Sequence, residues 1–279
     1  MQLPCPACGK STEHRALFVK NGCDILQCSA CGLGRARAAD FAPERYYTGD
    51  YFSGRRSDGY ADYLASEPVL RREFAQTIRF IRKHRPGGRL LEIGCAYGFF
   101  LQEAAPFFDV QGLEISDEAA AFCRQRGLSV STGIADEAAF ARLGRFDVIV
   151  LLDVIEHLVD PARTLALCCS HLERDGLIVL TTGDFSSLYA RLSGRNWRLM
   201  TPPQHLWYFT PDSIGRLSAS LGLRAAVCDH PWKLVPISLI SFQLARILGM
   251  KAPVWAGSRI GIPVNLFDAM RCLLRKTHP

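Results

Sequence analysis

The chain lacks the two parts that define a secretory signal peptide. Its first residues, Met-Gln-Leu-Pro-Cys-Pro, contain neither a basic segment nor an apolar stretch. It also lacks an uninterrupted apolar run of roughly 18 residues, the length that predicts a membrane-spanning helix. We therefore expect a cytoplasmic protein whose 11 cysteines are reduced and available to metal rather than paired in disulfides.

Positive charge is not concentrated in the basic helix or patch that is typical of nucleic-acid-binding proteins. The net charge is +6 over 279 residues, and the first 37 residues have no basic helix. We therefore expect no nucleic-acid partner. The densest basic stretch, 71–89, is interpreted as a solvated helix face, with an acidic substrate or an anionic membrane surface as alternatives. The scattered basic residues near the N-terminus are Lys10, Arg15, Lys20, Arg35 and Arg37.

A clean G-x-G-x-x-G motif is also missing, which disfavours a nicotinamide oxidoreductase. In its place, an apolar run at 90–93 leads into a small-residue turn, Gly94 to Gly98, and then into helix-forming residues. This pattern predicts a buried strand, a tight turn and a helix start. Glu92 precedes the turn, and a carboxylate there suits a cationic or donor-rich ligand and would repel a pyrophosphate. The alternative is an ordinary βα turn without a ligand.

Two similar cysteine knuckles stand at the N-terminus. Cys5-Pro-Ala-Cys8-Gly and Cys28-Ser-Ala-Cys31-Gly each place two thiolates on one tight turn. Two such turns facing each other form a closed tetrahedral Cys₄ site. We predict a structural zinc ribbon whose stability depends on the metal, with a pair of redox dithiols as the alternative.

The rest of the chain alternates between strand and helix patterns, which predicts a doubly wound α/β sheet with its site at the carboxyl ends of the strands. A second strand ends at Glu114, where a carboxylate is placed to accept the hydroxyls of a ribose. Asp136 follows a third strand and is placed to accept from the exocyclic amine of an adenine. The fourth strand, 145–152, has a run of β-branched and apolar residues, as expected of a parallel strand that is buried on both faces.

Three segments together resemble the class I S-adenosylmethionine-dependent methyltransferases. These segments are Glu92-Ile-Gly-Cys-Ala-Tyr-Gly98, Glu114, and Phe146-Asp-Val-Ile-Val-Leu-Leu-Asp-Val-Ile-Glu-His157. The resemblance is to the group that includes the ubiquinone-biosynthesis O-methyltransferases, and it runs from about Gly88 to Arg224. A cysteine ribbon ahead of such a domain also resembles, more loosely, the sugar C-methyltransferases of deoxysugar pathways.

The resemblance implies a Rossmann-like seven-stranded sheet whose last strand is antiparallel, together with roles for individual residues. Glu92 and the turn Gly94, Cys95, Ala96 and Gly98 would hold the methionine part of S-adenosylmethionine. Glu114 would hold the ribose, Asp136 the adenine, and Leu152 and Asp153 would line the cofactor. The expected partner is a small-molecule acceptor: a sugar, a lipid-linked glycan or a phenolic compound.

Two histidines are candidates for a catalytic base because imidazole titrates near neutral pH. His157 follows the fourth strand, and His205 lies in the loop Thr201-Pro-Pro-Gln-His-Leu-Trp-Tyr-Phe-Thr210. We favour His205, since this loop resembles the part that sets acceptor specificity in the same group, and Tyr208 is a weaker candidate. Each histidine has a structural contact as its alternative role, and methyl transfer also proceeds without a base when positioning is good.

The sequence divides into five parts. They are a zinc ribbon (1–45), an aromatic linker and helix (46–87), the methyltransferase core (88–230), an apolar helical insertion (231–263) and a final strand of the core (264–279). The insertion suits a peripheral membrane contact, a lid or a dimer surface. The main functional alternative is a zinc-ribbon binding protein whose methyltransferase-like domain is inactive. Nothing in the sequence sets the acceptor atom or the oligomeric state.

Overall fold

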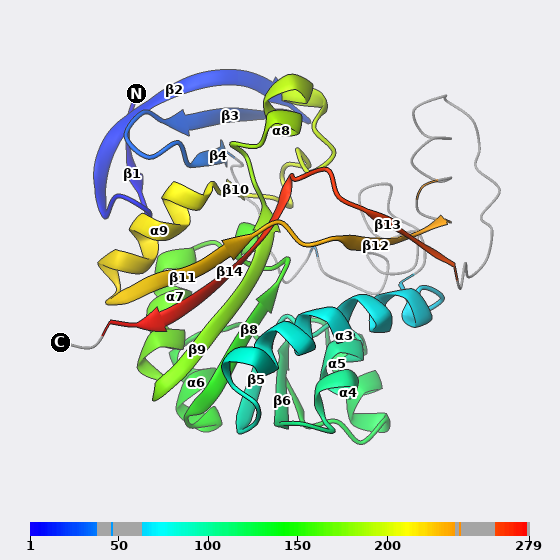
Figure 1. Cartoon of the computed structure of the whole chain (residues 1–279). Helices are drawn as coiled ribbons and strands as arrows, with labels where there is room; N and C mark the ends of the chain where they lie inside the picture. Colours follow the sequence, from blue (N-terminus) through cyan, green and yellow to red (C-terminus); the bar gives the residue numbers. More distant parts are fainter. Residues whose placement is uncertain (38–45, 47–62, 238–239, 241–259, 278–279) are drawn as a thin grey trace.

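The computed structural model describes residues 1–37, 46, 63–237, 240 and 260–277. It contains a doubly wound α/β core with a small antiparallel sheet at one end (Figure 1). The core sheet has the strand order β11-β14-β9-β8-β5-β6-β7. Its strands are β5 (Arg89–Ile93), β6 (Asp109–Glu114), β7 (Val130–Thr132), β8 (Phe146–Leu152), β9 (Leu172–Gly183), β11 (Leu223–Asp229) and β14 (Ala269–Lys276).

The predicted topology is confirmed. Strands β7, β6, β5, β8 and β9 pair in parallel, whereas β14 pairs antiparallel with both β9 and β11. Because a parallel sheet needs helices on both faces, the polar site is confined to the loops at the carboxyl ends of the strands.

Strand β8 lies in the centre of the sheet, and its apolar run from Val148 to Leu151 is buried on both faces. Val148 and Val150 pack on one side, while Ile149 and Leu151 pack on the other. The first side is covered by α3 (Glu67–His84), α4 (Phe99–Ala104) and α5 (Asp117–Gln125). The second is covered by α6 (Glu137–Leu143), α7 (Pro161–Ser170) and α9 (Pro211–Ser220) (Figure 1).

Side-chain caps set the starts of two helices of the core. The Ser116 hydroxyl accepts a hydrogen bond from the Ala119 amide at the start of α5. Thr210 and Ser213 form a reciprocal capping box at the start of α9. These caps fix the directions in which the two helices leave the sheet.

The small sheet at the N-terminus contains the predicted ribbon and one strand that the sequence did not predict. Its ribbon strands are β1 (Gln2–Cys5), β2 (Lys10–Lys20), β3 (Cys23–Cys28) and β4 (Gly34–Arg37). A fifth strand, β10 (Trp207–Tyr208), comes from the segment after β9 and pairs with β4. The ribbon is therefore hydrogen-bonded to the core domain.

Only part of the apolar helix predicted within 231–263 can be compared with the structure, because residues 238–239 and 241–259 lie outside the described residues. For the ends of this segment the prediction is wrong. Strand β12 (Lys233–Pro236) pairs antiparallel with β13 (Gly261–Val264). A Cβ on Gly261 would lie 2.6 Å from Val69 of α3, so the hairpin packs directly on that helix.

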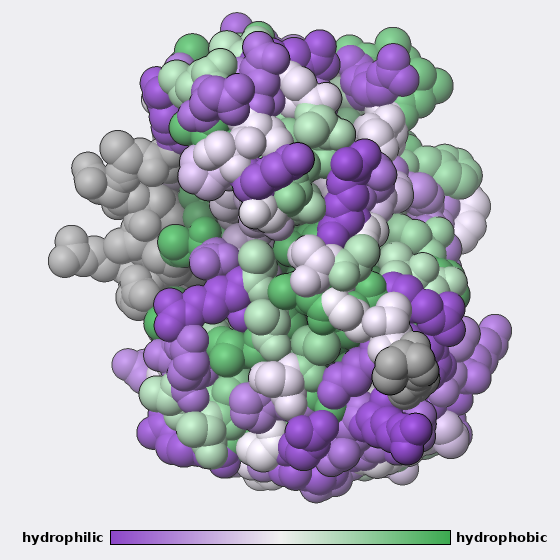
Figure 2. Space-filling model, turned by 90° about the vertical axis from the view of Figure 1, so that its left-hand side faces the viewer, coloured by the Kyte–Doolittle hydropathy of each residue, from purple (hydrophilic) through white to green (hydrophobic). Residues whose placement is uncertain are grey.

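The molecular surface beside the β11 edge is mixed in character. Figure 2 shows a band of hydrophobic surface between more hydrophilic parts on the side where α9 and β11 lie. Among the described helices, none has the length and apolar character needed to cross a bilayer. Of the predicted aromatic linker and helix at 46–87, residues 47–62 lie outside the described residues.

Candidate cofactor and acceptor site

The turn between β5 and α4 is shaped by its two glycines. Gly94 and Gly98 have φ angles of 71° and 72°, which side chains disfavour. A Cβ on Gly94 would lie 2.7 Å from Val154, and one on Gly98 would lie 2.6 Å from Leu128. The glycines are therefore required by backbone conformation and by packing, whereas the sequence suggested that they make room for a ligand.

Glu92, near the end of β5, is a buried carboxylate without a full set of partners. Its side chain is 3% exposed, and its Oε2 makes no hydrogen bond within the described part of the chain. Burial, with smaller effects from Cys123 and Glu114, raises the pKa of Glu92 well above its ordinary value. Such a group is costly unless a ligand brings hydrogen-bond donors or positive charge to it.

Glu114 ends β6, the strand beside β5, so the two acids lie at one edge of the sheet. Its Oε2 accepts from the Ala96 amide at 2.7 Å, and its Oε1 accepts from the Ser116 amide at 2.9 Å. Burial raises the pKa of Glu114, although these amides act in the opposite direction. Each oxygen keeps a second lone pair, which leaves it able to accept from a ribose hydroxyl.

The other predicted cofactor residues lie at neighbouring strand ends. Asp136, beyond β7, caps α6 by accepting from the Ala139 amide at 2.8 Å. Leu152 ends β8, and Asp153 follows it with a φ of 54°. The Asp153 carboxylate accepts from the Thr181 hydroxyl at 2.8 Å.

A lysine that the sequence did not single out also binds Asp153. Lys233 Nζ lies 3.0 Å from Asp153 Oδ2 and 3.3 Å from Glu73 Oε1 of α3. Burial opposes ionisation of Asp153, but Lys233 and the Thr181 hydroxyl outweigh it and lower the pKa of Asp153. Lys233 and Asp153 are 80 residues apart, and no local pattern links them.

The four predicted metal ligands come together in the ribbon. Cys5 and Cys31 have their Sγ atoms 3.6 Å apart, and Cys8 and Cys28 have theirs 3.9 Å apart. All four sulfur atoms lie within 4.8 Å of one another. Zn–S bonds of about 2.3 Å in a tetrahedron require sulfur separations of about 3.8 Å. The cluster therefore fits a closed structural zinc site.

The ribbon also holds the segment that carries His205. Trp207 pairs with Arg35 and Tyr208 pairs with Gly34 across β10 and β4. The Ala36 amide donates to the Leu206 carbonyl at 2.9 Å, directly beside His205. The position of His205 thus depends on contacts with the ribbon as well as with the core.

His157 and His205 lie against each other with ring centroids 4.6 Å apart. His157 Nδ1 is 2.8 Å from the Gln204 carbonyl, and His205 Nδ1 is 2.8 Å from the Leu199 carbonyl. Carbonyls only accept, so in both rings Nδ1 carries the proton and Nε2 keeps a lone pair. The two predicted histidines therefore meet, each held through Nδ1 by a backbone carbonyl.

Glu156 completes this cluster. Its ligand oxygen and the two imidazoles lie within 4.8 Å of one another, a composition that suits a divalent cation. Burial, with the charge of Asp153, raises the pKa of Glu156 to about 8. Burial, with the neighbouring His157, lowers the pKa of His205 to about 3, and burial lowers that of His157. Both rings are therefore neutral hydrogen-bond acceptors.

Tyr208 lies beside His205 but belongs to the ribbon contact. It is 2% exposed and packs among the apolar side chains of Ile25, Trp197 and Met200. Within the described residues its hydroxyl has no hydrogen-bond partner. Burial, with a smaller effect from Cys23, raises the pKa of Tyr208 well above its ordinary value. These surroundings favour a packing role.

The sheet order, the acidic strand ends and the glycine turn define the class of S-adenosylmethionine-dependent methyltransferases. A family model described as a methyltransferase domain matches residues 67–226. The match covers more than half of the chain, and the chain belongs to this family.

Curated relatives share part of the chain. The ubiquinone biosynthesis O-methyltransferase of Aromatoleum aromaticum is 27% identical over 153 residues, covering 50% of this chain and 65% of that protein. One from Cereibacter sphaeroides is 32% identical over 151 residues, covering 49% and 60%. The chain spans less than two thirds of the length of these two relatives.

Solved structures share the fold. A SAM-dependent methyltransferase from Archaeoglobus fulgidus has a TM-score of 0.54 at 19% identity, covering 77% of this chain and 99% of that one. The magnesium protoporphyrin IX methyltransferase of Synechocystis PCC 6803, solved with bound SAH, also has a TM-score of 0.54. Its identity is 13%, with coverage of 84% and 98%.

Proposed function

We propose that the protein transfers the methyl group of S-adenosylmethionine to a small-molecule acceptor, with a hydroxyl oxygen as the first candidate atom. The observation that carries this proposal is the unpartnered Oε2 of buried Glu92, beside Glu114 and the glycine turn. A ligand that has both an ammonium group and a sulfonium charge supplies what this carboxylate lacks.

Different residues of the site would bind different parts of the cofactor. Glu92 and the amides of 94–98 would bind the methionine part, and Glu114 would bind the ribose hydroxyls. Asp136 would reach the adenine, while Leu152 and Asp153 would line the side that faces β8. When bound, the cofactor supplies an electrophilic methyl group.

The acceptor would bind at the neighbouring ends of β8 and β9. Here Glu156, His157 and His205 offer acceptor atoms within 4.8 Å of one another. Because both rings are neutral, we assign them to binding and orienting polar groups of the acceptor. The proposal that His205 also removes a proton is weakened by its low pKa, since the imidazolium would be costly in this position.

The acceptor class rests on the curated relatives, which are named as O-methyltransferases of ubiquinone biosynthesis. They support a phenolic hydroxyl ahead of a sugar or a lipid-linked glycan. Membrane contact through 231–263 and a cytoplasmic location stay predictions. The alternative of an inactive binding protein is disfavoured because Glu92, Gly94, Gly98 and Glu114 are all present.

Calorimetry of the zinc-loaded protein with S-adenosylmethionine tests the cofactor part. We expect binding that Glu92→Gln weakens at least tenfold, whereas Glu173→Gln, on an exposed part of β9, leaves it unchanged. A mass-spectrometric assay with catechol, 3,4-dihydroxybenzoate and glucose then tests the acceptor. Absence of cofactor binding rules out the enzyme, and binding without transfer to any of the three supports the inactive alternative.

A further inference from the structure

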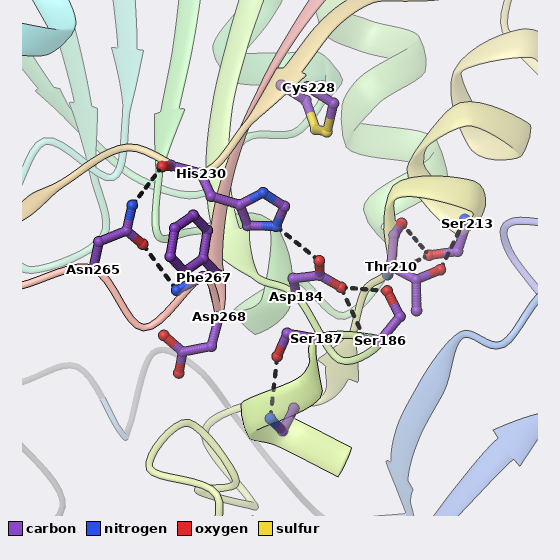
Figure 3. Close-up of polar contacts among 12 residues, drawn as sticks. Asp184, Ser186, Ser187, Thr210, Ser213, Cys228, His230, Asn265, Phe267 and Asp268 are labelled. Carbon is purple, nitrogen blue, oxygen red and sulfur yellow. Dashed lines mark hydrogen bonds and ion pairs between the residues drawn. A yellow bond between two sulfur atoms is a disulfide. The ribbon is translucent and has the colours of Figure 1, made fainter. Parts of the chain in front are cut away.

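A second histidine–carboxylate pair lies at the end of β9, outside the residues assigned above. His230 Nε2 is 2.9 Å from Asp184 Oδ2. Asp184 follows β9 by one residue and is 4% exposed, whereas the His230 side chain is 28% exposed. Figure 3 shows the imidazole between Asp184 and Phe267, with its second nitrogen directed away from Asp184.

The Asp184 carboxylate is held in place by hydrogen bonds to both of its oxygens. Its Oδ1 accepts from the Ser186 amide at 2.9 Å and from the Ser186 hydroxyl at 2.6 Å, which leaves Oδ2 for His230 (Figure 3). The Asp184 amide donates to the Asp268 carbonyl at 2.8 Å. A carboxylate only accepts, so the imidazole donates from Nε2, and Nδ1 keeps the lone pair.

The backbone fixes His230 in the same way. The His230 carbonyl accepts from Asn265 Nδ2 at 2.9 Å, and the Asn265 side chain also accepts from the Phe267 amide at 2.8 Å. The Phe267 ring lies 6.3 Å from the imidazole and is 63% exposed. The His230 imidazole is partly exposed beside an exposed aromatic ring, so a ligand can reach it from solvent.

The segment that carries His230 also reaches the expected cofactor site. Three residues further along, Lys233 binds Asp153 at the end of β8. The Asp153 amide donates to the Thr181 hydroxyl, so these two residues lie side by side. Asp184 lies three residues beyond Thr181, which is about 10 Å further along the strand direction. Asp184, and His230 bound to it, therefore lie further out than Asp153, beyond the carboxyl end of β9.

The pair also borders the His205 cluster. His205 Nδ1 donates to the Leu199 carbonyl. The Leu199 side chain packs against Gly183, where an added Cβ would lie 2.9 Å from it. Gly183 immediately precedes Asp184. Both histidine sites thus face the end of the same strand.

We propose that His230 is the catalytic base of the methyl transfer and that Asp184 is its positioning residue. This inference rests on the proposed function. As the acceptor oxygen forms its bond to the methyl carbon, its O–H proton passes to His230 Nδ1. The carbon–sulfur bond breaks, and its electron pair stays on sulfur as a neutral thioether. Asp184 accepts from Nε2 and so keeps Nδ1 unprotonated and directed away from the carboxylate, ready to take the proton.

The test compares wild type with His230→Gln, His230→Ala and Asp184→Asn, with His171→Gln on the far side of the core as the matched control. With catechol and 3,4-dihydroxybenzoate, we expect both His230 variants to lose at least 100-fold in kcat/KM. The acid limb of the pH profile should disappear, and added imidazole should partly rescue His230→Ala. Asp184→Asn should lose at least tenfold, and His171→Gln should match wild type.

Two readouts do not depend on turnover. Calorimetry with S-adenosylmethionine should give the same affinity for wild type and both His230 variants. Diethyl pyrocarbonate, mapped by peptide mass spectrometry, should modify His230 faster than His205, and catechol should protect His230. Equal kcat/KM in wild type and His230→Gln, or unprotected His230, overturns this inference alone. Absence of cofactor binding or of transfer in wild type overturns the proposed function and this inference with it.

Discussion

Gly34 of the ribbon and Tyr208 of the segment after β9 are partners in one antiparallel ladder. A Cβ on Gly34 would lie 2.9 Å from Tyr208 Cβ and 2.8 Å from the Phe185 ring. The ribbon and the His205 segment thus meet without space for a single methyl group. Through this contact the zinc module fixes the position of the segment that carries His205.

The first prediction follows from this contact. Gly34→Ala should displace Tyr208 and Phe185 and lower the free energy of unfolding by about 1–3 kcal/mol, the usual cost of overpacking. Methyl transfer should fall while S-adenosylmethionine affinity is kept, because the cofactor residues lie on other strands. Urea unfolding and calorimetry measure the two effects.

Gly215→Ala is the matched control for this substitution. Gly215 lies within α9, and a Cβ there would have nothing within 4 Å. Alanine at a helix position is favourable, so we expect equal or higher stability. If Gly34→Ala behaves like Gly215→Ala in both measurements, the tight contact between ribbon and core is not important.

The second prediction concerns removal of the zinc. Cys31→Ser breaks the Cys₄ site, and the ribbon has too small a core to remain folded without metal. We expect zinc content measured by atomic absorption to fall, and transfer to the acceptor to be lost. Cofactor affinity should stay within about threefold, since β5, β6 and β8 belong to the seven-stranded sheet and not to the ribbon sheet.

Cys169→Ser, at a half-buried thiol on α7, is the control for general effects of losing a cysteine. It should keep both zinc and activity. Full transfer by a Cys31→Ser protein that has lost its zinc would show that the ribbon does not support the His205 segment.

The sequence predicted those features that depend on local patterns. The strand–turn–helix at 89–101 and the buried strand β8 both follow from the pattern of apolar and small residues. The four cysteines could be grouped because each knuckle is a short repeat whose ligand type is unambiguous.

The remaining features depend on contacts between distant segments. Strand β10 has two residues, too few to show a period, and it forms only because β4 offers a free edge. Lys233 reaches Asp153 across 80 residues of sequence, and His230 reaches Asp184 across 46. No sequence pattern marks either pair, because the partners meet only in the folded sheet, where the strand ends lie side by side.

The third prediction is a pH dependence of stability caused by Glu156. Burial and the charge of Asp153 raise its pKa from an ordinary value of about 4.5 to about 8 in the folded protein. Between these values the native state holds a proton that the unfolded state has released, so this group makes unfolding easier as pH rises. Its stabilising contribution is fully present below about pH 4.5 and is lost as pH rises through about 8.

Glu156→Gln removes this titration without a large change of shape. Relative to wild type, its free energy of unfolding should therefore improve by roughly 2–5 kcal/mol between pH 4.5 and 8, at about 1.4 kcal/mol per unit of pKa shift. Urea denaturation of both proteins at several pH values measures the difference. Parallel curves across this range would mean that Glu156 titrates normally.

The fourth prediction separates the role of His205 from that of His230. Its Nδ1 is bound to the Leu199 carbonyl and its pKa is about 3, so the ring stays neutral from pH 5 to 9. His205→Ala should keep cofactor affinity and lose about 10–100-fold in kcat/KM, the value of one or two hydrogen bonds to a charged or polarised group. The shape of its pH profile should remain that of wild type.

The pH profile of kcat/KM alone distinguishes a histidine that binds the acceptor from one that takes its proton. A base that accepts the proton imposes its own ionisation on kcat/KM, whereas a neutral hydrogen-bond acceptor lowers the rate equally at every pH. If the acid limb disappears in His205→Ala, then His205 is the base after all and His230 is not. If turnover stays near wild type, then His205 does not bind the acceptor, and its contacts with Leu199 and His157 serve only to fold the segment.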